Sequence, residues 1–93
     1  MTEFLEWATN NIFKVLPLKE ERNIGLYDYL DSVYIQLYGA MTTFPELSED
    51  IDYISILNTL AFLKDNSFTT KTCKREVFKC LSLLKKIKSA YEV

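Results

Sequence analysis

The chain has 93 residues, of which 48% are apolar and 14% are aromatic, and it carries a net charge of −2. This composition excludes a disordered tail, and a chain of this length buries roughly 60–65% of the surface that its unfolded form exposes, enough for one core. The chain contains no histidine, which excludes Ser-His, Cys-His and metal-histidine chemistry. No apolar run reaches the roughly 18 residues that a membrane span needs, so we expect no contact with a membrane.

Charge is distributed unevenly along the chain. Residues 1–66 hold 11 acidic and 4 basic side chains (−7), whereas residues 67–93 hold 2 acidic and 7 basic ones (+5). Helices of unlike charge that meet across a bundle would explain this division, and composition favours that interpretation over an acidic surface that faces a partner. Glu3 and Glu6 lie where a secretory signal carries positive charge, so we expect a cytoplasmic protein.

The first helix is predicted over residues 2–16, with Thr2 as its N-cap and Pro17 as its stop. Its apolar stripe consists of Phe4, Ala8, Ile12 and Val15. Residues 18–25 fit either a loop or an extra helical turn, and Gly25 favours a helix that begins directly after it.

The second helix is predicted over residues 26–41. Its buried stripe consists of Leu26, Leu30, Val33 and Leu37, with Ala40 and Met41 at its end. Tyr27, Tyr34 and Tyr38 form a second line beside this stripe, next to Asp31, with Asp28 and Ile35 facing further outward.

The third helix is predicted over residues 48–65. Pro45 biases Phe44 away from helical geometry, and Ser48 or Asp50 can cap the helix start, where acidic residues suit the helix dipole. Apolar residues surround most of its circumference: Ile51, Tyr53, Ile54, Ile56, Leu57, Leu60, Ala61, Phe62 and Leu63. We therefore expect it to be the central and most buried element.

The fourth helix is predicted over residues 70–91, with Thr69, Thr70 and Thr72 as alternative caps. Its apolar seam consists of Cys73, Val77, Cys80, Leu84, Ile87 and Tyr91. Seven residues of helix rise about 10.5 Å, beyond the roughly 7 Å limit for two bridged cysteines, so both thiols should be free and buried. The predicted fold is therefore all-α, a single-domain bundle of four helices over residues 1–93.

Acidic residues are densest at Glu46, Glu49, Asp50 and Asp52. At a helix start such carboxylates are more often solvated partners of the dipole than catalytic acids or bases. Gly25 and Gly39 stand alone, so there is no phosphate-binding glycine loop. We expect a protein that is not an enzyme, with no cofactor, no metal and no small-molecule ligand.

Two surfaces remain as candidates for binding. The predicted fourth helix carries Lys71, Lys74, Arg75, Lys79, Lys85, Lys86 and Lys88. These cations fit either nucleic acid or a solvated face, and the acidic pI near 5.1 argues against nucleic acid as the partner. The tyrosines of the second helix suit the centre of a protein interface, although tyrosines also close the edge of a small core.

The stretches "GLYDYLDSVYIQLYG" and "FPELSEDIDYISIL" combine tyrosines with carboxylates in a small helical chain. In size, charge and surface character the chain resembles small helical bacterial toxin-immunity proteins. The resemblance implies a protein partner, a cognate toxin that is neutralised by occlusion rather than by catalysis. The basic fourth helix departs from strongly acidic members of that group, which weighs against a nuclease as the target.

For a partner-binding role we single out Tyr27, Asp31, Tyr34, Tyr38, Glu46, Glu49, Asp50 and Asp52. Two alternatives stay open. One is a helical adaptor or regulator, of phage or mobile-element type, that binds a host protein or associates with itself. The other is a small nucleic-acid-associated protein that uses the basic fourth helix.

Overall fold

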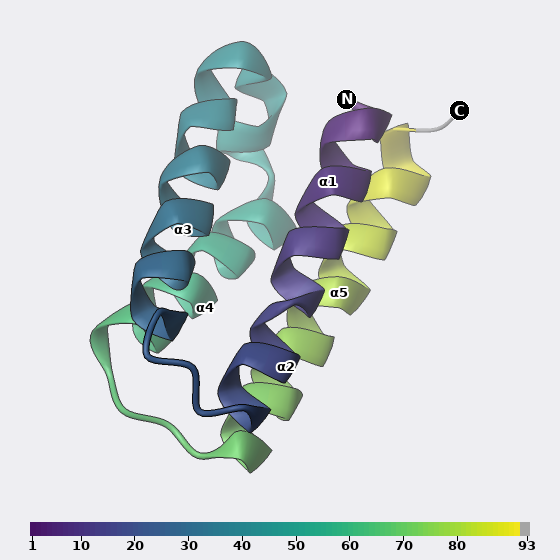
Figure 1. The fold of residues 1–93 in the computed structure, drawn as a ribbon. Helices are drawn as coiled ribbons and strands as arrows, with labels where there is room; N and C mark the ends of the chain where they lie inside the picture. The colour runs from purple at the N-terminus through teal and green to yellow at the C-terminus, as the bar shows by residue number, and fades with distance from the viewer. Residues whose placement is uncertain (92–93) are drawn as a thin grey trace.

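Helices packed side by side make up the fold, and the computed structural model describes residues 1–91. The elements are α1 (Thr2–Phe13), α2 (Val15–Glu20), α3 (Leu26–Thr43), the 3₁₀ helix η1 (Pro45–Glu49), α4 (Ile51–Asp65) and α5 (Thr70–Tyr91). Within residues 1–91 there is no strand, and the predicted all-α bundle of four helices is confirmed, with α1 and α2 forming one arm. Figure 1 shows α3 beside α4 and the α1–α2 arm beside α5, with the amino terminus and the end of α5 at the same end of the molecule.

The first arm differs from the predicted helix at both of its ends. Thr2 is the first helical residue, and Met1 holds the N-cap position, where its carbonyl accepts a hydrogen bond from the Leu5 amide (3.0 Å). Pro17 lies inside α2, at its third residue, instead of after a helix. A proline ring clashes with the carbonyl four residues earlier, which here belongs to Phe13, and this is where α1 ends.

The starts of α4 and α5 are set by capping side chains. A carboxylate oxygen of Asp50 accepts hydrogen bonds from the amides of Asp52 (2.9 Å) and Tyr53 (3.1 Å), so α4 begins at Ile51 and not at residue 48. Of the possible caps for α5, Thr69 acts, because its hydroxyl accepts a hydrogen bond from the Thr72 amide (3.1 Å). Both caps pair helix amides that would otherwise lack a partner.

The core forms where the predicted stripes meet. In α3 and α5 the predicted positions are buried: Leu26, Leu30, Val33, Leu37, Ala40, Cys73, Val77, Cys80, Leu84 and Ile87. Three end positions differ. Tyr91 is exposed beyond the last turn that packs, Met41 is only partly buried, and Phe4 is also only partly buried, with Leu5 in its place in the core. Both thiols are free and buried, as predicted, and burial raises the pKa of Cys80 from 9.0 to about 12.

The prediction that α4 is buried around most of its circumference is wrong for one side. Tyr53, Ile56, Leu57, Leu60 and Leu63 are buried in the core. Ile51, however, is 85% exposed and Phe62 is 49% exposed. The reason is that α4 packs against α3, η1 and α5, and no other element of residues 1–91 covers its remaining side. The central position predicted for this helix is also shared with α5, because α5 packs along α1, α2 and α4.

Two tyrosine hydroxyls connect helices across the core. The buried Tyr53 hydroxyl donates to the Leu37 carbonyl and so joins α4 to α3. The Tyr29 hydroxyl donates to the Asn11 carbonyl (2.7 Å) and joins α3 to α1.

Among residues 1–91, no helix is both long enough and apolar enough to cross a bilayer.

Candidate functional site

The outward flank of α3 carries the predicted tyrosine line. We call Tyr27, Asp31, Tyr34, Ile35 and Tyr38 the α3 surface. The rings of Tyr34 and Tyr38 stack with their centroids 6.1 Å apart and their planes at 29°. Tyr38 is 58% exposed and Ile35 is 59% exposed, whereas Tyr34 is partly buried against the core, so one ring of the stacked pair and an aliphatic side chain face solvent on one helix. Large apolar side chains that are both exposed and held in place suit the centre of a protein interface.

Lys64, from the last turn of α4, holds the middle of the α3 surface in place. Its Nζ lies 5.2 Å from the centroid of the Tyr34 ring, 3.6 Å from Asp31 Oδ1 and 3.3 Å from Asp65 Oδ1. The hydrogen bond to Asp65, followed by the charges of Asp65 and Asp31, raises the pKa of Lys64. Sequence reasoning did not include Lys64 in the site; the available signal was that it is the one basic residue of the third predicted helix.

Tyr27 has a structural role at one end of the α3 surface. Its hydroxyl donates to the Asn66 carbonyl (3.2 Å), and its ring forms a T-shaped contact with the Phe68 ring, with the centroids 5.9 Å apart. Lys19 Nζ lies 4.8 Å from the centroid of the same Phe68 ring. Tyr27 thus helps to hold the connection between α4 and α5, and the part of it that a partner can reach is smaller than at Tyr38.

The acidic residues around the start of α4 divide into two kinds. Asp50 caps α4, and Asp52 Oδ2 lies 3.5 Å from Lys86 Nζ of α5. Glu46 and Glu49, on η1, are exposed. Only these last two carboxylates face solvent without a capping or pairing role in the fold.

The acidic residues and the α3 surface lie at different ends of the bundle. Lys64, which contacts Asp31 and Tyr34, comes twelve residues after Asp52 on the same helix, a rise of about 18 Å. At the acidic end, burial and the charges of Asp50 and Glu46 raise the pKa of Tyr91. The structure therefore brings together Asp31, Tyr34 and Tyr38, and it places the acidic residues beside the end of α5.

The basic face of α5 is partly neutralised within the chain. Lys86 pairs with Asp52, and Lys88 Nζ lies 3.1 Å from Glu6 Oε1 of α1. Within α5, Glu76 carries ion pairs with Lys79 (2.7 Å) and Arg75 (3.6 Å), which lower its pKa. Unlike charges therefore meet across the bundle, as the charge division favours, although exposed pairs of this kind each stabilise a fold by only about 0–1 kcal/mol.

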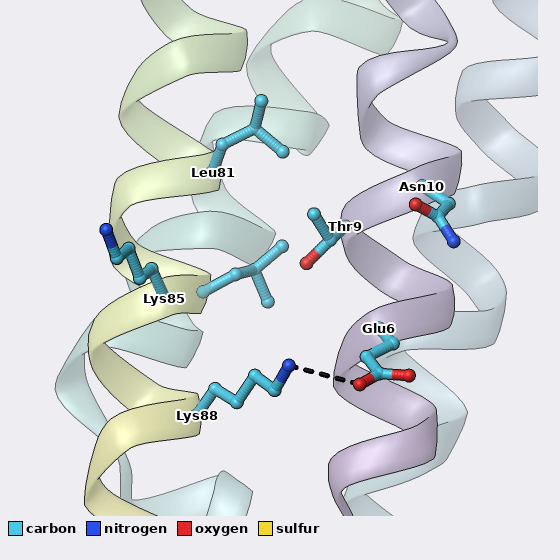
Figure 2. Close-up of a pocket in the computed structure, with 7 residues that line it drawn as sticks. Glu6, Thr9, Asn10, Leu81, Lys85 and Lys88 are labelled. Atoms are coloured by element: carbon cyan, nitrogen blue, oxygen red, sulfur yellow. Dashed lines mark hydrogen bonds and ion pairs between the residues drawn. The ribbon is translucent and has the colours of Figure 1, made fainter.

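A groove of about 420 Å³ runs between α1 and α5 (Figure 2). Its lining combines Leu81 and Leu84 with Thr9, Asn10, Glu6, Lys85 and Lys88. The single carboxylate, Glu6, is bound to Lys88, and the Thr9 hydroxyl donates to the Leu5 carbonyl (2.8 Å). The groove thus offers no second carboxylate and no activated nucleophile for acid-base or covalent chemistry.

Over residues 1–91, no three Cys, Asp or Glu side chains gather where they could hold a metal ion. Comparisons of the chain with protein-family models, with curated proteins and with solved structures found no match.

Proposed function

We propose that the chain is a protein-binding module without catalytic activity, and that it acts as an immunity protein that occludes a cognate bacterial toxin with its α3 surface. The observation that carries this proposal is the stacked Tyr34–Tyr38 pair, with Tyr38 and Ile35 more than half exposed. Tyrosine gives large contact area with few rotatable bonds, so ordering it in an interface costs little entropy. The contacts of Lys64 to Tyr34 and Asp31 order part of this surface before any partner arrives.

The charge of α3 indicates which kind of partner fits. The helix carries Asp28 and Asp31 and has no lysine or arginine in its eighteen residues. Glu46 and Glu49, on η1 directly after α3, add exposed negative charge. A partner with a basic rim and an apolar pocket would therefore be attracted over a distance and then held by the aromatic side chains.

An immunity protein is expected to be encoded directly downstream of its toxin. The test is therefore whether the chain binds the protein that the open reading frame directly upstream encodes. We expect a complex in a titration of the two purified proteins, and relief of growth arrest when both are expressed together. Tyr38→Ala should weaken binding by about 2 kcal/mol or more, which is roughly thirtyfold, mainly through faster dissociation.

Phe78→Ala is the matched control, because Phe78 is also about half exposed but lies on α5. It should leave affinity within about twofold, a change of under 0.5 kcal/mol. Reversing Glu46 and Glu49 to lysine should slow association and reduce its dependence on salt. Asp50 and Asp52 are left unchanged in this variant because they cap α4 and pair with Lys86.

A complex that tolerates Tyr38→Ala and Ile35→Ser but is lost when Lys74, Lys79 and Lys86 are neutralised would refute the proposal. In that case the basic face of α5 would be the functional surface, and nucleic acid would be the partner to test.

A further inference from the structure

A second groove, of about 360 Å³, lies between α1 and the end of α3. Figure 1 shows the start of α1 and the end of α3 at the same end of the molecule. Three aromatic side chains line this groove together with small and polar residues of α3: Phe4, Trp7, Phe44, Gln36, Gly39, Ala40 and Thr43. We call it the aromatic groove. None of these lining residues is charged.

The aromatic rings of the groove form a continuous surface. The Phe4 ring stacks on Trp7 with the centroids 5.8 Å apart and the planes at 20°, and its centroid lies 5.7 Å from that of Phe44. All three side chains are partly buried against the core, so they are held in place and still reach solvent. The faces of such rings carry partial negative charge and attract cations.

Gly39 keeps the groove open on its α3 side. A Cβ added at Gly39 would meet no atom within 4 Å, so a larger side chain there would extend into the groove. Glycine inside a helix is less stable than alanine, and neither a close contact nor a positive φ requires it here. The missing side chain therefore costs the helix stability and leaves room for a ligand.

Negative charge surrounds the aromatic groove. Residues 1–13 and 26–63, the two segments that contain all of the lining residues, have no lysine or arginine. Glu3 on α1 and Glu46 on η1, close in the chain to the aromatic residues, are exposed. A cation that approaches the groove is therefore attracted by these carboxylates, and no basic side chain of these two segments competes with it.

The α3 side of the groove supplies hydrogen-bond acceptors. The Gln36 carboxamide nitrogen donates to the Ser32 hydroxyl (3.3 Å), which leaves the carboxamide oxygen able to accept. The groove also borders the last turn of α3, where the helix dipole is negative and where α3 has no basic residue. Pro45 has no amide hydrogen, so the Met41 carbonyl lacks its helical donor.

We propose that the aromatic groove is a binding site for an arginine side chain of a partner polypeptide. A guanidinium group is planar and weakly hydrated, so it stacks on aromatic rings, and its alkyl stem covers apolar surface. It has five N–H donors and no acceptor, which matches a groove that presents acceptors and negative charge. A lysine would bring the charge but no planar face to stack.

A polypeptide fits this site better than free arginine does. Gly39 lies four residues after the exposed Ile35 and shares its side of α3, so the groove adjoins a surface that a chain could cover while its arginine enters the groove. Free arginine also carries a carboxylate, which the acidic surroundings would repel. The inference does not depend on the toxin proposal, because any partner with such an arginine would serve.

Fluorescence of Trp7 tests the proposal, because it is the single tryptophan of the chain and lines the groove. The probe is the peptide acetyl-Gly-Leu-Arg-Leu-Gly-amide, and two control peptides carry citrulline or lysine in place of arginine. Citrulline keeps the shape of arginine without its charge. We expect the arginine peptide to change the Trp7 emission with a Kd of about 1 mM or below, and both control peptides to bind at least about threefold more weakly.

Gly39→Leu fills the groove without removing an interaction of the fold, so it should raise the Kd at least about tenfold. Leucine favours a helix more than glycine does, so this variant should unfold at no lower urea concentration than the wild type. Ser82→Leu, at an exposed position of α5, is the matched control and should change the Kd by less than about twofold.

Three results would overturn the proposal: Trp7 emission that does not respond to the arginine peptide at about 10 mM, a citrulline peptide that binds as tightly as the arginine peptide, or binding that Gly39→Leu leaves unchanged. If free arginine bound as tightly as the peptide, the groove would be a small-molecule site and not a docking site for a polypeptide. None of these measurements uses the upstream-encoded protein, so a failure here is distinct from a failure of the toxin proposal.

Discussion

Removing one buried hydroxyl tests how α3 and α4 are joined. The Tyr53 side chain is fully buried, and its hydroxyl donates to the Leu37 carbonyl of α3. Tyr53→Phe keeps the ring and its packing but removes this donor. The Leu37 carbonyl lies four residues before Met41 inside α3, so it keeps its helical hydrogen bond and is not left without a partner.

The expected loss follows from that geometry. A buried hydrogen bond stabilises a fold by about 0.5–1.5 kcal/mol net, and a larger loss requires an acceptor that is left unpaired. We therefore expect Tyr53→Phe to lower the free energy of unfolding by about 1 kcal/mol, which is a drop of roughly 4–8 °C in Tm for a domain of this size. The slope of unfolding against denaturant should not change, because the same surface is exposed on unfolding.

Urea unfolding followed by circular dichroism measures this difference. Tyr38→Phe is the control, since Tyr38 is exposed, and it should change stability by less than about 0.5 kcal/mol. If Tyr53→Phe were as stable as the wild type, the hydroxyl would not stabilise the α3–α4 contact and the reasoning would be refuted.

Three further predictions concern stability. Leu60→Ala, at a fully buried position, should cost about 2–5 kcal/mol in urea unfolding, whereas Ile24→Ala, at a fully exposed one, should stay within about 0.5 kcal/mol; equal effects would contradict the assigned core. Asp50→Ala should cost about 1 kcal/mol through loss of the α4 cap, and Glu49→Ala, next to it, almost nothing. Burial raises the pKa of the Cys80 thiol from 9.0 to about 12, so the folded chain keeps the proton that the unfolded chain loses above pH 9, and stability falls as pH rises. Between about pH 8 and pH 10 the ionisation of Cys80 in the unfolded chain should lower the free energy of unfolding by about 1.4 kcal/mol, and Cys80→Ala should lack this loss. If the free energy of unfolding fell in parallel with pH in the two proteins, the thiol would not be buried.

The helices themselves could be predicted from sequence because burial on one side leaves a period. In α5 the recurring apolar positions identify both the helix and its buried face, and the cysteines follow from their place in that period. The interruption near Pro17 was less predictable. Proline is excluded from a helix interior but accepted in the first turn of a helix. Pro17 was therefore compatible either with the end of the first helix or with the start of another, and in the structure it lies in the first turn of α2.

The candidate site was predictable only in part. Helical spacing places Tyr34 and Tyr38 on one flank, and the structure stacks them. Their neighbour Lys64 comes from a helix that lies thirty residues further along the chain, and local periodicity carries no information about such a contact. The same holds for Asp52 and Lys86, whose pairing depends on how α4 meets α5.

By itself the sequence determined which segments are helical, where charge divides and that both cysteines belong to an apolar seam, since these properties depend on near neighbours in the chain. The tertiary structure alone decided which apolar side chains remain in solvent. A helix that is apolar on all sides has no preferred inner face, and Ile51 and Phe62 are exposed because three elements cover the other sides of α4. Exposure of this kind depends on the number and placement of neighbouring helices, which is a property of the packed bundle and not of any single segment.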